Sequence, residues 1–247
     1  MTKNPVEEID NSDGLVDLLL FDHNSEDNII WATDNKSIQK NPIEPRDIYK
    51  IEPRFMKSKE RRARRTKDRA EVFTPPDVCK LQNDLIVRPW LDKPLDQFID
   101  ATFLEITCGE APYIVSRYNV VDGTPIAIDN RVGLLDRKLQ SINQSVDNQK
   151  LWLELARRAF QSVYGYEFQG DNLFIARCNL FLTAQEFYRQ KFRAELPYDF
   201  LNDLVDIITW NFFQYDGLNR CRPFDEYGGV FGSCKIMDWK AGAPDEF

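Results

Sequence analysis

Three acidic residues, Glu105, Glu167 and Asp216, each lie at or near the end of a short β-prone segment. The carboxyl ends of parallel strands share one edge of a sheet, and ligands bind at that edge. A carboxylate there can accept hydrogen bonds from ribose hydroxyls or from an exocyclic amine. One such acid is more often only a turn former. Three acids in this order indicate a small-ligand site.

The segment from Phe103 to Pro112 is the centre of this arrangement. Phe103, Leu104 and Ile106 are expected to be buried at the end of a strand, and Gly109 allows a tight turn. The residues that follow, 111–115, predict the beginning of a helix. A strand, a glycine turn and a helix N-terminus together can hold a small ligand.

The elements that must position the acids alternate between strand and helix. Further strands are predicted over 162–167, 210–215 and 234–239, and apolar spacing predicts helices over 131–142, 151–163, 173–187 and 198–208. The alternation predicts an α/β fold with a mostly parallel sheet flanked by helices.

Residues 1–55 form a predicted N-terminal arm, separate from a main domain over residues 56–247. A short helix is expected over 15–20, a second apolar patch over 29–32, and a proline-rich extended connector over 41–53. The simplest interpretation of the arm is a strap packed on the main domain.

A strongly basic stretch runs from Lys57 to Arg69, with eight basic residues against Glu60 and Asp68. It contains no proline or glycine and can be helical. Lysine and arginine in such a helix can contact nucleic-acid phosphates without reading sequence. The alternative is an ordinary solvated helix face. The candidate DNA contacts are Arg61, Arg62, Arg64, Arg65 and Lys67.

Directly after the basic stretch, the sequence Phe73-Thr74-Pro75-Pro76 is typical of a helix start. Thr74 can cap the helix, and the prolines suit its first turn. The helical spacing of four apolar residues predicts a buried face, formed by Val78, Leu81, Leu85 and Ile86.

The composition excludes several function classes. The 247 residues carry a net charge of −8, so any basic surface for nucleic acid is local. The single histidine, His23, and five scattered cysteines have no zinc-ligand spacing, so neither a metal site nor a Cys-His nucleophile is expected. No signal peptide or membrane span is evident, and the cytoplasm is the expected location.

The order of four motifs resembles the N6-adenine DNA methyltransferases, in particular the methylation subunits of bacterial restriction-modification systems. These motifs are Glu-Val-Phe-Thr-Pro (71–75), Phe-Leu-Glu-Ile-Thr-Cys-Gly-Glu (103–110), Tyr-Gly-Tyr-Glu (164–167) and Gln-Tyr-Asp-Gly-Leu (214–218). The resemblance covers roughly residues 50 to 240. It implies a Rossmann-like fold, S-adenosylmethionine as cofactor and DNA as partner.

The resemblance also implies roles for individual residues. Phe73, Thr74 and Pro75 would close over the methionine end of S-adenosylmethionine. Glu105, Cys108 and Gly109 would line the methionine and the ribose. Glu167 would accept the ribose hydroxyls, and Asp216 would accept the adenine amine.

Two departures from the family limit what the resemblance implies. Ala111 stands where the family usually has a second glycine, and its methyl group would crowd the cofactor. No Asn/Asp-Pro-Pro-aromatic element, which holds the flipped adenine, follows Asp216. The catalytic residues are therefore unknown. Three readings stay open: a methyltransferase completed by a second subunit, an inactive relative that binds DNA or a partner, and a structural α/β domain with chance matches.

Overall fold

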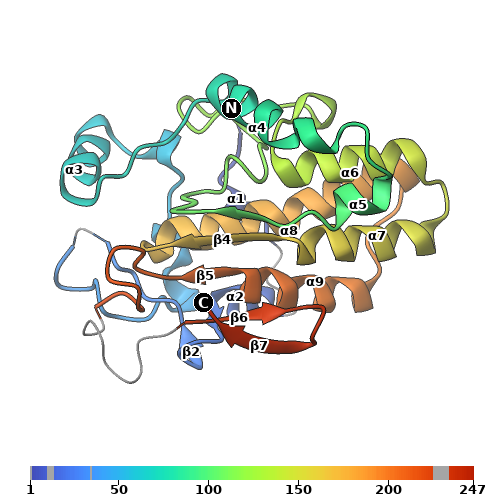
Figure 1. The fold of residues 1–247 in the computed structure, drawn as a ribbon. Coiled ribbons are helices and arrows are strands. Elements are labelled where there is room, and N and C mark those ends of the chain that lie inside the picture. The colour runs from blue at the N-terminus through green and yellow to red at the C-terminus, as the bar shows by residue number, and fades with distance from the viewer. Residues whose placement is uncertain (1, 10–13, 34, 225–233) are drawn as a thin grey trace.

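The computed structural model of the chain describes residues 2–9, 14–33, 35–224 and 234–247. Its centre is a parallel sheet of three strands, β3 (Phe103–Glu105), β4 (Val163–Glu167) and β5 (Phe212–Gln214), in the order β3-β4-β5. The register pairs Glu105 with Gly165 and Glu167 with Gln214, so the strands end at one edge. Helices flank the sheet, which confirms the predicted α/β class (Figure 1).

Four helices pack around this sheet: α6 (Leu134–Ser145), α7 (Gln149–Gln161), α8 (Gly170–Phe192) and α9 (Tyr198–Asn211). They confirm the four helices predicted from apolar spacing, with ends shifted by a few residues. The remaining helices of the described part are α1 (Pro5–Glu8), α2 (Leu15–Leu20), α3 (Lys59–Arg69), α4 (Pro76–Val87) and α5 (Leu95–Ile99), with 3-10 turns η1 (Pro45–Lys50), η2 (Arg54–Met56), η3 (Arg88–Trp90) and η4 (Ile128–Asn130).

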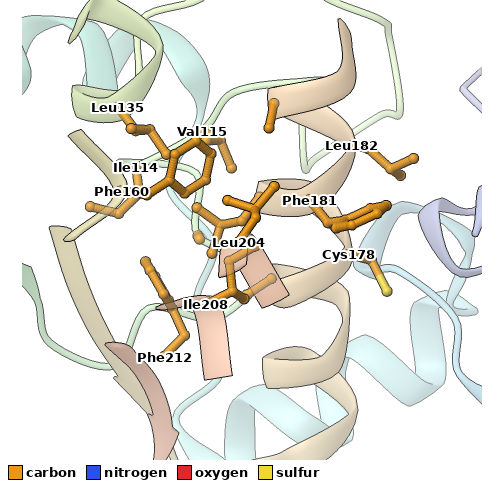
Figure 2. Close-up of a cluster of buried hydrophobic side chains, with 14 of the residues drawn as sticks. Ile114, Val115, Leu135, Phe160, Cys178, Phe181, Leu182, Leu204, Ile208 and Phe212 are labelled. Carbon is orange, nitrogen blue, oxygen red and sulfur yellow. The ribbon is translucent and has the colours of Figure 1, made fainter. Parts of the chain in front are cut away.

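The hydrophobic core lies where α6, α7, α8 and α9 meet the sheet. Figure 2 shows Leu135, Phe160, Leu204 and Phe212 gathered on one side of α8, whereas Phe181 and Cys178 lie on its other side. Helix α8 is buried along most of its length, because other elements cover it on several sides. The strands whose carboxyl ends form the sheet edge are therefore fixed by a tightly packed core.

The N-terminal arm contributes to this same core. Leu19 and Leu20 of α2 are fully buried, and α2 packs against α8 and α9. A side chain at Gly170 would collide with the carbonyl oxygen of Ile30, so glycine lets the arm approach the start of α8. The strands β1 (Phe21–Asp22) and β2 (Asp27–Asn28) form a small antiparallel pair within the arm. Part of the predicted extended connector, residues 45–50, is the 3-10 turn η1.

The predicted helix over 111–115 is absent, because residues 109–110 and 112–114 form turns. Gly109 and Ala111 both have left-handed backbone conformations, with φ of 57° and 61°, and these interrupt an α-helix. The expected burial of Leu104 and Ile106 is also wrong. These residues remain 46% and 63% exposed, because both border an open pocket instead of the core.

The predicted buried face of α4 is wrong as well. Val78, Leu81, Leu85 and Ile86 are exposed, whereas Cys79, Asn83 and Val87 point inward. Apolar spacing identifies a helix face but not what covers it. Thr74 does not cap the helix; Pro75 occupies the cap position.

The last strands form a separate antiparallel hairpin instead of extending the parallel sheet. It consists of β6 (Lys235–Asp238) and β7 (Ala243–Glu246), so the strand predicted over 234–239 is present but pairs differently. Among the described residues, no helix is long and apolar enough to span a bilayer.

Candidate functional site

A pocket of about 300 Å³ lies at the carboxyl end of β3, between this strand and the start of α4. Five of the eight predicted cofactor residues line it, namely Phe73, Thr74, Glu105, Cys108 and Gly109. Ala111 is fully buried and does not line the pocket, so its methyl group leaves this space open. Ligand sites commonly span about 300–1,000 Å³. This volume suits one end of a cofactor-sized molecule.

The wall of the pocket depends on close contact between Gly109 and Phe73. A Cβ atom built on Gly109 would lie 3.1 Å from Cε1 of the Phe73 ring, and the φ of 57° also favours glycine. The guanidinium of Arg54 lies 5.1 Å from the centre of the same ring. Phe73 is therefore held in place from two sides.

Glu105 carries an unused acceptor at this pocket. Burial raises its pKa well above the usual carboxyl value, although the backbone N–H of Tyr113 bonds to the carboxylate. Its Oε2 atom is buried without a hydrogen-bond partner among the described residues. A cationic ligand group beside it would favour the ionised form and supply the missing donor.

Asn83 is a pocket residue that sequence reasoning missed. Its amide donates to the carbonyls of Tyr113 and Val132 at 2.9 Å each, and its Oδ1 atom has no partner within the described structure. The spacing of Cys79, Asn83 and Val87 along α4 was the available signal. Two unused acceptors on one pocket, from Asn83 and Glu105, favour a ligand that carries N–H donors.

Glu167 lies behind the glycine turn instead of lining the pocket. Its Oε2 accepts from the backbone N–H of Gly109 at 2.8 Å, and its Oε1 accepts from that of Gln169 at 3.0 Å. Burial raises its pKa to about 7, and these two bonds oppose the shift. In this structure the carboxylate binds the backbone that shapes the pocket.

Asp216 follows β5 at the same sheet edge and is outside the pocket. Its side chain accepts hydrogen bonds from the N–H groups of Leu218 and Asn219 and from the side-chain amide of Asn219. Asp216 thus stabilises its own turn, which is the common role of an aspartate there.

Cys108 is buried at the floor of the pocket. Burial, followed by the charge of Glu105, raises the pKa of its thiol far above the usual value. A thiol in that state is a poor nucleophile. The side chain therefore acts as an apolar wall of the site. Within the described part of the chain, no group of His, Cys, Asp or Glu residues is arranged to hold a metal ion.

The basic stretch forms helix α3, as predicted, and α3 extends away from the sheet at the left of Figure 1. Ser58 caps the helix by accepting from the N–H of Arg61. Arg64 and Lys67 are exposed, and Arg61 and Arg62 are partly exposed. All four lie on the helix surface, where the guanidinium of Arg61 is ion-paired with Glu52 at 2.6 Å.

Arg65 is the exception, and it corrects the predicted set of DNA contacts. Its side chain is fully buried and forms a bidentate ion pair with Asp171, with N–O distances of 2.8 and 2.9 Å. Its Nε atom also donates to Glu71. Lys57 lies 3.5 Å from Asp171 in the same cluster. Arg65 fastens α3 to the start of α8 and is unavailable to phosphate.

The comparisons with known proteins give no identification. No protein-family model matches the chain, and no significant match is found among curated proteins or solved structures.

Proposed function

We propose that this chain is a Rossmann-like, S-adenosylmethionine-binding protein related to the N6-adenine DNA methyltransferases of restriction-modification systems. The observation that carries the proposal is the convergence of Phe73, Thr74, Glu105, Cys108 and Gly109 on one pocket. These residues come from two segments about 30 positions apart, and each segment carries one of the motifs of the resemblance. The proposed activity fits a cytoplasmic protein.

In the proposed complex, the methionine end of S-adenosylmethionine occupies the pocket. Its ammonium group provides N–H donors and a positive charge for the unused acceptors of Glu105 and Asn83. Phe73 and Cys108 supply apolar walls for the methylene chain. The adenosine end extends along the sheet edge towards Glu167 and Asp216, the carboxyl ends of the neighbouring strands.

DNA is the proposed substrate, and its phosphates contact α3 through Arg61, Arg62, Arg64 and Lys67. Such contacts supply affinity that falls with salt and carry no sequence information. If a second subunit provided an adenine-holding loop, the methyl group would pass from the sulfonium to N6 of a flipped adenine, which would leave the thioether S-adenosylhomocysteine and release one amine proton to solvent. Positioning of the two reactants then supplies most of the rate gain.

A second candidate is a catalytically inactive subunit that keeps the fold for binding DNA or a partner. One observation favours it: the carboxylates of Glu167 and Asp216 already accept hydrogen bonds from nearby backbone N–H groups. Transfer of tritium from labelled cofactor to bacterial DNA separates the candidates. The assay should be run with the chain alone and with an added restriction-modification subunit. Label in the adenine supports the first candidate, and cofactor binding without transfer in either mixture supports the second.

A further inference from the structure

A turn of the N-terminal arm, residues 35–41, lies against the C-terminal part of α3; we call it the arm turn. The guanidinium of Arg69 donates to the backbone carbonyl of Thr33 at 3.0 Å and to the side chain of Gln39 at 3.1 Å. The buried Arg65 donates to the hydroxyl of Thr33 at 3.2 Å. In Figure 1 this blue turn lies below α3, on the same side of the molecule. These bonds hold the arm turn and α3 together.

The arm turn is cationic, although the whole chain is acidic. Residues 35–41 contain Lys36 and Lys40 but no Asp or Glu, in a chain whose net charge is −8. Both lysines are exposed. Three further polar side chains of the turn are exposed with them: Asn35, Ser37 and Asn41. Lysine, amide and hydroxyl groups are common hydrogen-bond donors to nucleic-acid phosphates.

The arm turn also reaches the carboxyl edge of the sheet. The ammonium group of Lys40 lies 5.5 Å from the centre of the Phe224 ring. This ring packs edge-on against Phe168, which directly follows β4, with 5.5 Å between the two ring centres. The guanidinium of Arg69 lies 5.4 Å from the centre of the Phe168 ring. Cations from the arm turn and from α3 therefore gather beside one pair of rings at this edge.

The composition of this surface favours nucleic acid over a protein or a membrane. Among the described residues, none of the exposed large apolar side chains belongs to α3 or to the arm turn. Protein interfaces have an apolar core, and a helix that lies on a membrane buries an apolar face in it. Interfaces with DNA are more polar and much more positively charged. The surface of α3 and the arm turn has this second composition.

We propose that α3 and the arm turn form one nucleic-acid-binding surface, in which Lys36 and Lys40 contact phosphates of the DNA segment that α3 binds. The inference rests on the proposed DNA partner and extends its contacts to the N-terminal arm. Because Arg65 and Arg69 already fasten the two elements to each other, binding requires little further ordering of the backbone. Contacts to phosphate add affinity without sequence selectivity.

The salt dependence of duplex binding, measured by fluorescence anisotropy with the full chain, tests the proposal. Each phosphate contact contributes about 0.9 to the slope of log affinity against log salt concentration, so Lys36→Gln and Lys40→Gln together should lower the slope by up to about 1.8. Arginine at both positions should preserve it. The matched control is Lys93→Gln with Lys150→Gln. Both lysines are exposed, and they precede α5 and belong to α7, which lie at the right of Figure 1.

A second measurement uses the wild-type chain alone. Acetylation of lysine side chains, followed by mass spectrometry, reports which lysines a bound duplex covers. The duplex should protect Lys36 and Lys40 and leave Lys93 and Lys150 as reactive as in the free protein. Polyglutamate of equal total charge should give no such protection, because the surface lacks the apolar contacts that a protein partner uses.

The outcomes separate this inference from the proposed function on which it rests. Suppose that the wild type binds the duplex and that the slope falls for Arg62→Gln with Lys67→Gln but not for the lysine pair of the arm turn. That result would overturn the role of the arm turn alone. Equal protection of all four lysines would overturn it too, and protection by polyglutamate would assign the surface to an acidic protein. A wild type that binds no duplex would overturn the DNA partner as well.

Discussion

The backbone N–H of Gly109 donates a hydrogen bond of 2.8 Å to Oε2 of Glu167, 58 positions away along the chain. This bond joins the turn after β3 to the end of β4 across the sheet edge. Gln169 binds the other oxygen of the same carboxylate, at 3.0 Å. The shape of the pocket therefore depends on a buried acid that does not itself line it.

Replacing Glu167 with glutamine should remove a pH-dependent loss of stability. Burial raises the folded pKa of Glu167 from 4.5 to about 7, so the unfolded chain releases this proton first as the pH rises. The wild type should lose up to roughly 3 kcal/mol, relative to Glu167→Gln, between these two pH values and no more above them. Chemical unfolding at a series of pH values measures this difference. Exposed Glu154→Gln is the control, and parallel curves for wild type and Glu167→Gln would refute the expectation.

Gly109→Ala should cost more stability than the same substitution at Gly14. Both glycines have left-handed φ angles, 57° and 71°, so each alanine carries a backbone strain of about 1–2 kcal/mol. Only the methyl group at Gly109 meets a neighbour, the Phe73 ring, because nothing lies within 4 Å at Gly14. The difference in free energy of unfolding isolates this contact. Equal losses for the two variants would show that Phe73 does not pack on the turn.

Arg65→Met should destabilise the fold by about 3–5 kcal/mol, because it leaves the buried Asp171 and Glu71 without their main cation. Lys67→Met, on the exposed part of the same helix, should change the free energy of unfolding by less than about 0.5 kcal/mol. Urea unfolding of both variants makes the comparison. Similar small losses in the two proteins would mean that the buried cluster does not hold α3.

Replacing Arg62 and Lys67 together with glutamine should weaken the salt dependence of DNA binding. Each phosphate contact contributes about 0.9 to the slope of log affinity against log salt concentration. Fluorescence anisotropy with a labelled duplex measures this slope. Lys150→Gln, an exposed change outside α3, should leave it unaltered. If the double variant keeps the wild-type slope, α3 is a solvated face.

The sequence predicted most of the fold because strand and helix periodicities are local signals. Phe73 and Glu105, which the motif resemblance assigned to a cofactor, line one pocket, and their binding of a cofactor stays a prediction. Long-range pairing could not be inferred: the partner of Arg65 is Asp171, 106 positions away. The exposure of Leu81 and Leu85 on α4 could not be predicted either, because apolar residues have the same spacing whether that helix face is buried or exposed.

Equilibrium binding of tritiated S-adenosylmethionine, measured over a series of pH values upward from the ordinary carboxyl pKa, tests the central claim most directly. Deprotonation of Glu105, whose pKa burial raises, should favour a cationic ligand, so affinity should increase with pH. We expect one cofactor per wild-type chain, and Glu105→Gln should bind at least about tenfold more weakly with a smaller pH dependence. Absence of saturable binding, or equal affinity of wild type and Glu105→Gln at every pH, would contradict the account.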